Sequence, residues 1–139
     1  MTSEQIALIK KTWNAFRGVD PVMVGEVFYS RLFYTSPKLR KMFDRSMTDQ
    51  YKKLIDMLSL MVARLDKLDE ISEEMKQLGM RHAGYGVKPA HYKVVGEALL
   101  WTLEKGLGND WNPKVEKAWS DCYDMIAETM ISAAEAKLA

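Results

Sequence analysis

Apolar residues recur at steps of three and four along most of the chain, the spacing that places them on one face of an α-helix. The first such stretch follows Thr2, which forms the S/T-x-x-Q pattern of a capping box with Gln5. The apolar face of this predicted helix carries Ile6, Ile9, Trp13 and Phe16. Gly18 is expected to end it, because glycine readily adopts the backbone conformation that closes a helix.

A second helix is predicted to begin at Asp20, whose carboxylate can cap free amides, with Pro21 at the first helical position. Its apolar residues form two adjacent stripes, so neighbouring elements should enclose the helix on more than one side. The stripes are Val24, Phe28 and Leu32, and beside them Tyr29 and Phe33. Pro37 then opens a short turn that ends at Phe43.

Two further helices are predicted in the middle of the chain. The apolar face of the first carries Leu54, Ile55, Leu58, Met61, Val62 and Leu65. The face of the second carries Ile71, Met75, Leu78 and His82, at steps of four, three and four. Gly84 and Gly86 are expected to end this helix.

The last two helices are each introduced by a proline. Pro89 opens a helix that carries Val95, Leu99 and Leu103 and is expected to end near Gly106 and Gly108. Asn112 and Pro113 introduce the final helix. Its stripe is Val115, Trp119, Cys122, Ile126 and Met130.

The pattern therefore predicts an all-α fold of about six main helices plus a short turn, within one domain over residues 1–139. No segment alternates convincingly as a strand. The mixed helix lengths and the corners broken by glycine do not favour a symmetric four-helix bundle.

Composition narrows the possible partners. The 20 basic and 19 acidic residues leave a net charge of +1, which argues against nucleic acid or an anionic membrane as the main partner. No apolar run is long enough to span a bilayer, and the N-terminus lacks the apolar core of a signal peptide. The single Cys122 fits a reducing compartment, so a cytoplasmic location is expected.

Both histidines of the chain lie in the window MRHAGYGVKPAHY. His82 falls in the last turn of a predicted helix, where a protonated imidazole interacts favourably with the helix dipole. No cluster of Cys, His and carboxylates has the spacing of a zinc site. A single histidine can nevertheless hold iron when a porphyrin supplies the other ligands, and the residues alone leave both interpretations open. His91 is expected to lie exposed at a helix start.

Five segments, in order and at the proper separations, resemble the bacterial globins of the Vitreoscilla type and the haem domain of flavohaemoglobins. They are FYSRLF, LRKMFD, QYKKL, RHAGYGVKPAHYKVVGEALL and AWSDCYDMIAE. The resemblance implies a globin fold around a haem b, with His82 as the proximal iron ligand. The second ring nitrogen of His82 is then expected to donate to a main-chain carbonyl near Leu78, which fixes the tautomer.

The resemblance also implies roles for other residues. On the ligand-binding side Tyr29 and Gln50 would donate hydrogen bonds to a bound gas molecule, with Leu54 as the apolar wall beside it. Phe43 would lie against the porphyrin face, and Arg81 would reach a propionate. The remaining cofactor contacts implied are Val87, Tyr92, Val95, Leu99 and Ile126.

The chain departs from the family pattern at one proximal position. In flavohaemoglobins a tyrosine that matches Tyr92 joins a glutamate of the last helix and polarises the proximal histidine. Here Ala134 stands at the position of that glutamate, and Glu135 follows one residue later, about 100° around the helix. A strong proximal push, and the peroxidase-like activity it would support, is therefore not expected.

The resemblance implies a haem globin that binds O2 reversibly, with NO and CO as further ligands. With a separate, unidentified reductase it could support the conversion of NO to nitrate by bound O2, since the chain ends directly after its last helix. A monomer or weak dimer is expected. Two alternatives stay open: a haem-free interaction or stress-sensing module of globin type, and a haem-based gas sensor.

Overall fold

The computed structural model describes residues 1–16, 18–43 and 46–138, and within these ranges the all-α prediction is confirmed. The six α-helices are α1 (Ser3–Phe16), α2 (Pro21–Thr35), α3 (Met47–Ala63), α4 (Leu68–Gly84), α5 (Pro89–Leu107) and α6 (Pro113–Leu138). Three short 3₁₀ helices join them: η1 (Pro37–Met42), η2 (Leu65–Lys67) and η3 (Gly108–Asp110). The described ranges contain no strand.

The helix starts follow from local side-chain chemistry. Thr2 and Gln5 form the reciprocal capping box, with N–H to side-chain oxygen distances of 3.0 and 3.1 Å. The Asp20 carboxylate accepts from the backbone N–H of Val22 at 3.0 Å. Each bond satisfies an amide that has no partner within the helix, so these starts could be predicted from sequence.

One expected helix end is wrong and another is confirmed. The α3 helix stops at Ala63, and Leu65 lies in η2, where it is still only 1% exposed. The end expected near Gly106 and Gly108 is confirmed, since α5 runs to Leu107 and Gly108, at a φ of +55°, caps it. A Cβ at position 106 would lie 2.0 Å from the Phe16 ring, so Gly106 also permits packing against α1.

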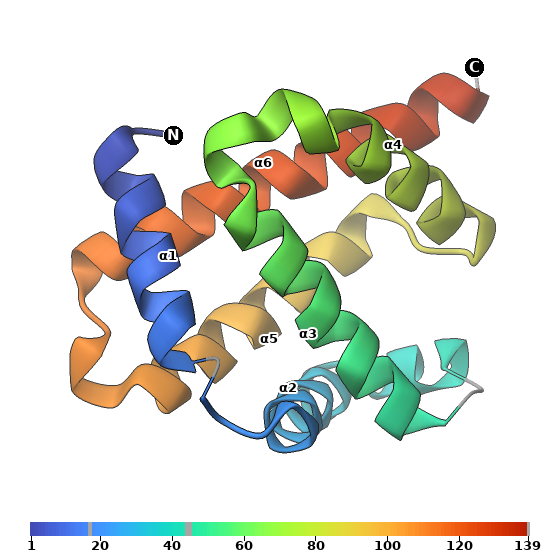
Figure 1. Ribbon diagram of the computed structural model, residues 1–139. Coiled ribbons are helices and arrows are strands. Elements are labelled where there is room, and N and C mark those ends of the chain that lie inside the picture. The colour runs from blue at the N-terminus through green and yellow to red at the C-terminus, as the bar shows by residue number, and fades with distance from the viewer. Residues whose placement is uncertain (17, 44–45, 139) are drawn as a thin grey trace.

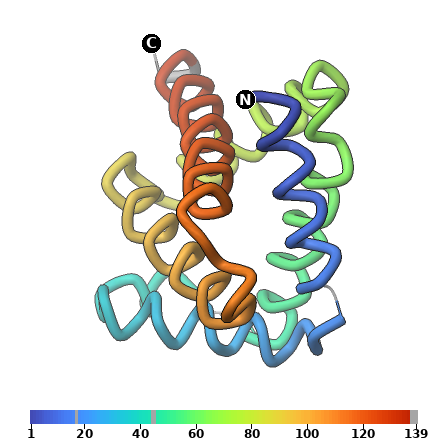
Figure 2. The backbone as a smooth tube through the Cα atoms, turned by 90° about the vertical axis from the view of Figure 1, so that its left-hand side faces the viewer, coloured from blue at the N-terminus to red at the C-terminus, as the bar shows by residue number. Residues whose placement is uncertain are grey.

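Helix α2 lies across one end of the molecule, at the bottom of Figure 2. Above it in this view, α5 and α6 lie toward the left and α1 and α3 toward the right. Helix α2 packs against α3 and α5, while α4 packs mainly against α6. Helices α3 and α4 diverge from η2 and hardly approach each other elsewhere (Figure 1). The helix that carries Gln50 and Leu54 and the helix that carries His82 are therefore held by different neighbours.

Two close helix crossings depend on glycine. A Cβ at Gly25 would lie 2.4 Å from the Cβ of Tyr51, so the α2–α3 crossing requires a residue without a side chain. A Cβ at Gly79 would lie 2.3 Å from the carbonyl oxygen of Met130, where α4 crosses α6. These crossings set the positions of α3 and α4 within the fold.

Most buried apolar side chains belong to one core. It includes Trp13 and Trp119, whose indole N–H groups donate to Ser59 at 3.2 Å and to Thr12 at 2.9 Å. A smaller cluster, formed by Met61, Ile71 and Met75, lies between α3 and α4. In the described part of the chain, none of the helices combines the length and the apolar character that crossing a bilayer would need.

Candidate functional site

His82 lies half-buried in the last turn of α4. Its Nδ1 lies 2.8 Å from the carbonyl oxygen of Leu78, and since a carbonyl can only accept, Nδ1 carries the proton. Burial lowers the pKa of His82 below its usual value, although the bond to Leu78 opposes this shift. The imidazole is therefore neutral near pH 7, and its Nε2 has no hydrogen-bond partner among the described residues.

The backbone turns sharply after His82. The N–H of Val87 donates back to the carbonyl of His82 at 3.0 Å, and Gly86 has a φ of +89°. A φ in this region favours glycine, whereas Gly84 is still part of the helix. Gly86 is thus the glycine that allows the chain to reverse beneath His82 and place the half-buried Val87 beside it.

Tyr92 lies in the first turns of α5, beside His82. The two ring centroids are 6.5 Å apart, and the planes are tilted by 33°. The hydroxyl of Tyr123 donates to the main-chain carbonyl of Tyr92 at 2.5 Å. A Cβ at Gly96 would lie 2.6 Å from the Tyr123 ring, so this glycine lets Tyr123 reach that carbonyl. Sequence reasoning missed Tyr123, because nothing in the local pattern of α6 indicates a bond to α5.

Two further expectations concern the same region. His91 is half-buried and not exposed, because its ring turns back over the start of α5. There its Nδ1 accepts the Lys88 backbone N–H at 2.9 Å, so His91 serves as a helix cap. Ala134 is half-buried on α6, while Glu135 is exposed to solvent.

Tyr29 is the centre of an aromatic cluster formed by α2, α3 and Phe43. Its side chain is 7% exposed, and four rings surround it. The centroid distances are 4.8 Å to Phe28, 5.3 Å to Phe43, 5.7 Å to Tyr51 and 5.8 Å to Phe33. Tyr51 had not been predicted as part of the site, and the signal that could have found it is Gly25, whose missing side chain admits it.

Burial, and secondarily the neighbouring Tyr51, raises the pKa of Tyr29 to about 12. The phenol is therefore protonated at neutral pH and can donate a hydrogen bond. Among the described residues its hydroxyl has no hydrogen-bond partner. No fully buried side-chain oxygen or nitrogen in this part of the chain lacks a partner, so the Tyr29 hydroxyl lies at an edge of the core.

The other expected site residues of the distal side and the core are half-buried or buried. Gln50 and Leu54 are half-buried, one turn apart on α3, and Leu54 packs against the main core. Gln50 makes no side-chain hydrogen bond with any described residue. The apolar candidates that belong to the core or pack against it are Phe43, Val95, Leu99 and Ile126.

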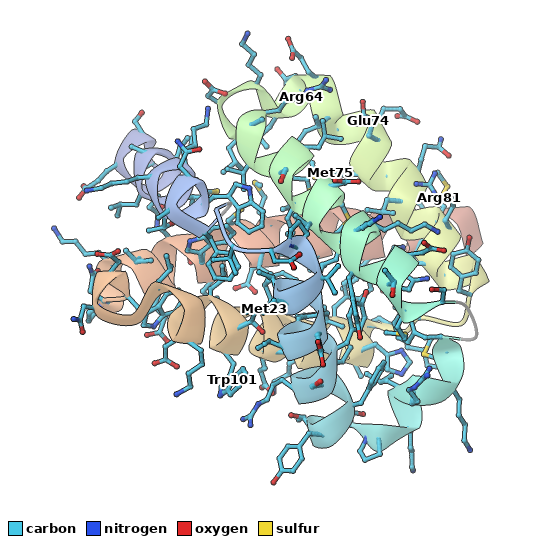
Figure 3. The ribbon with its side chains drawn as sticks, turned by 60° about the horizontal axis from the view of Figure 1, so that its bottom comes forward. Met23, Arg64, Glu74, Met75, Arg81 and Trp101 are labelled. Atoms are coloured by element: carbon cyan, nitrogen blue, oxygen red, sulfur yellow. The ribbon has the colours of Figure 1, made fainter. Side chains whose placement is uncertain are left out.

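Arg81 is the one expected cofactor contact that lies exposed, and Figure 3 shows it on α4 together with Glu74 and Met75. It forms no salt bridge with a described acidic residue. The structure therefore gathers the apolar and aromatic candidates but assigns no partner to Arg81.

These residues fit a haem better than a bare metal ion. The described residues include no group of three or more His, Cys, Asp and Glu side chains that could hold an ion. His82 can offer one nitrogen lone pair, the number that a porphyrin iron needs from one side. Half-buried apolar and aromatic side chains supply the surroundings that a flat apolar cofactor requires.

Comparison with known proteins decides the family. The model of the globin family, described as "Globin", matches residues 26–130. The chain belongs to the globin family. It is 32% identical to a flavohemoprotein of Bacillus subtilis, over 94% of this chain and 33% of the relative. It is 31% identical to an uncharacterized globin-like protein of Aquifex aeolicus, over 95% and 93%.

Solved structures agree on the fold. A bacterial globin from Campylobacter jejuni matches with a TM-score of 0.83 at 24% identity, covering 99% of both chains. An engineered carbene transferase from Rhodothermus marinus matches with a TM-score of 0.88 at 22% identity, over 99% of this chain and 96% of that one. The predicted globin fold is thus confirmed.

Membership of the globin family implies a haem cofactor, and globins bind small gas molecules. The chain spans about a third of the length of the flavohemoproteins it matches, 33% and 35% for two of them. The activity of those longer proteins as a whole is therefore not assigned to this chain.

Proposed function

We propose that this globin holds a haem b through His82 and binds O2 reversibly and tightly, with CO and NO as further ligands. With a separate reductase it would also support the conversion of NO to nitrate by O2. We further propose that it acts in the cytoplasm, as a monomer or weak dimer.

The observation that carries this proposal is the state of the His82 side chain. Its Nδ1 is committed to Leu78 at 2.8 Å, and burial favours the neutral imidazole. Nε2 is therefore the nitrogen left with a lone pair, and the ring that carries it is already oriented. A histidine that only stabilised the helix dipole would instead be charged. Haem held by His82 would supply the iron that takes a gas ligand.

The distal residues supply the expected affinity for O2. Tyr29 has a protonated hydroxyl without a partner among the described residues, and the half-buried Gln50 lies at the start of α3. A hydrogen bond to a ligand that carries partial charge stabilises it by roughly 1.5–3 kcal/mol. One such donor would slow O2 release by about tenfold or more. Leu54 would exclude water beside the ligand.

The proximal side supports ligand binding more strongly than oxidative catalysis. Ala134 stands where flavohaemoglobins carry the polarising glutamate, and the exposed Glu135 is directed to solvent. Tyr92, Val87, Val95, Leu99 and Ile126 would serve as apolar contacts for the haem, with Phe43 against its face. Arg81 remains a proposed partner of a propionate, since its exposed side chain is free to turn.

Absorption spectroscopy tests the proposal directly. The purified protein, reconstituted with haemin if necessary, should show a strong Soret band that shifts when CO or O2 is added to the reduced form. A protein that takes up no haemin would contradict the proposal and favour the haem-free interaction module.

A second measurement separates a gas carrier or sensor from an NO-consuming enzyme. The oxygenated protein is mixed with NO in the presence of an efficient reductase, and NO loss is followed electrochemically. Many turnovers per haem support the dioxygenase role. A single turnover under efficient reduction would remove that role and leave reversible O2 binding.

A further inference from the structure

The charges of this chain are distributed unevenly, despite a net charge of only +1. The segment 30–43 contains four basic residues, Arg31, Lys38, Arg40 and Lys41, and no acidic one. The segment 66–74 contains five acidic residues and one lysine. The first segment ends α2 and forms η1, and the second forms most of η2 and the first turns of α4.

The basic segment lies far from the acidic one. Figure 3 shows Glu74 at one end of the molecule and Trp101, which contacts Arg31, near the other. Ion pairs with Lys10 and Arg64 hold two acidic residues of segment 66–74, at 3.1 and 3.5 Å. Within the described ranges, no salt bridge involves a basic residue of segment 30–43. No carboxylate among the described residues is therefore within ion-pair distance of these four charges.

Two aromatic rings lie against Arg31, one of these four cations. The Arg31 guanidinium lies 4.8 Å from the Trp101 ring centroid and 5.8 Å from that of Tyr34, which is 79% exposed. Lys105 extends the same surface, at 5.7 Å from Trp101. Aromatic residues and arginine are enriched at protein interfaces relative to the rest of the surface, and this region combines both.

The same segment borders the distal part of the site. Arg40 lies 5.6 Å from the Phe33 ring centroid and donates to the carbonyl of Phe43 at 2.7 Å. Phe33 and Phe43 both pack against Tyr29. A protein that docked on the exposed lysines of η1 would thus lie next to the aromatic cluster around Tyr29.

We infer that the basic surface, defined as segment 30–43 with Trp101 and Lys105, is the docking site for an acidic electron-donor protein. This inference rests on the proposed function, which needs an external reductase. Haem held by His82 would take up one electron, the donor would give it up, and no bond would be formed or broken. Electron-transfer encounters bury little area, below roughly 1,200 Å², so such an encounter needs only a small docking surface. Charge complementarity raises the association rate of such encounters by about 10- to 1,000-fold.

The test compares two double variants of the haem-loaded protein. Lys38→Glu with Lys41→Glu reverses two exposed charges of η1 and leaves Arg31 and Arg40 intact. Lys11→Glu with Lys67→Glu reverses two exposed charges elsewhere. Each reversal changes the charge by −2, so both doubles go from +1 to −3. The probe is reduced flavodoxin, a small acidic flavoprotein, and reduction of the ferric haem is followed by stopped flow at low and high ionic strength.

We expect the η1 double to reduce the second-order rate by about tenfold or more at low ionic strength, with the difference lost at high salt. The Lys11/Lys67 double should lose less than about threefold. The affinity for oxidised flavodoxin, measured by calorimetry without any turnover, should also fall more in the η1 double than in the Lys11/Lys67 double. Hexaammineruthenium(II), a small cationic reductant, should show the opposite preference and react faster with the η1 double.

Equal losses in both doubles would show that net charge alone acts, and would overturn the inference. So would an unchanged rate in the η1 double. Association of the wild-type chain at low salt that the η1 double abolishes would identify a second copy as the occupant instead. All these outcomes presuppose normal CO binding. A wild-type protein without haem or CO binding would overturn the proposed function itself and this inference with it.

Discussion

The two halves of the site are fixed by different kinds of interaction. Around His82, hydrogen bonds to main-chain carbonyls set the geometry, from His82 to Leu78 at 2.8 Å and from Tyr123 to Tyr92 at 2.5 Å. Around Tyr29, rings pack against rings, and its hydroxyl has no partner among the described residues. One half therefore holds its polar groups in place, while the other keeps a polar group available.

This difference matches the tasks proposed for the two halves. An iron ligand benefits from a fixed ring, because a second-shell hydrogen bond sets its tautomer and basicity. A donor that must bind and release a gas needs a hydroxyl that no protein acceptor occupies. The two halves have one feature in common: each depends on a glycine at a helix crossing, Gly79 for α4 and Gly25 for α2.

The largest expected effect comes from removing the fixed imidazole. His82→Ala should abolish stable haem uptake, because the other histidine of the chain, His91, already uses its Nδ1 to accept the Lys88 backbone N–H. The measurement is the Soret absorbance per protein after haemin titration and gel filtration. Added imidazole should restore part of the band by filling the vacated position. His91→Ala is the matched control and should retain haem, since His91 only caps α5.

A smaller but substantial effect should follow from adding a side chain at Gly25, where α2 and α3 cross beside Tyr29. Gly25→Ala places a Cβ 2.4 Å from the Tyr51 Cβ, and 2.8 Å from its Cα, so α2 and α3 must separate. Overpacking of this kind lowers the free energy of unfolding by about 1–3 kcal/mol. Urea unfolding of the apo-protein measures it. Gly84→Ala is the control, because nothing lies within 4 Å of a Cβ there, and similar losses in both variants would argue against the crossing.

The role of the Tyr29 hydroxyl as a hydrogen-bond donor is tested by removing its oxygen. Tyr29→Phe keeps the ring within its aromatic cluster and should raise the O2 dissociation rate by about tenfold or more. CO carries less partial charge than O2, so CO dissociation should change less. Tyr34→Phe, at a residue 79% exposed, is the control. An O2 rate that stays at the wild-type value in Tyr29→Phe would remove Tyr29 from the proposed role.

The contrast between the halves also explains how far the sequence could predict them. The bond from His82 to Leu78 joins residues four apart on one helix, so it follows from helical geometry once the role of His82 is assumed. The capping interactions of Thr2 and Asp20 are equally local. The prediction of six helices depended on such short-range signals, and it is confirmed.

Contacts between distant segments could not be predicted in the same way. Tyr123 reaches Tyr92 across 31 positions, and Tyr51 meets Tyr29 only because Gly25 lets two helices touch. The packing role of Gly106 is another contact of this kind, because nothing in the local sequence shows that this glycine admits the Phe16 ring. The resemblance to bacterial globins supplied the candidate residues, and tertiary packing decides which of them meet.

The smallest expected effect is an absence of pH dependence in the distal half. Burial and the neighbouring Tyr51 raise the pKa of Tyr29 to about 12, so the donating, protonated form persists until the pH approaches that value. The O2 dissociation rate should therefore stay flat from about pH 6 to about pH 10, where an ordinary phenol would already be half ionised. Tyr51→Phe removes the weaker of the two causes, so the rate should begin to rise at a slightly lower pH. If the O2 dissociation rate of the wild-type protein instead rose near pH 10, the Tyr29 hydroxyl would be solvated like an ordinary phenol. Burial of Tyr29 could then not explain why this hydroxyl differs from the fixed polar groups around His82.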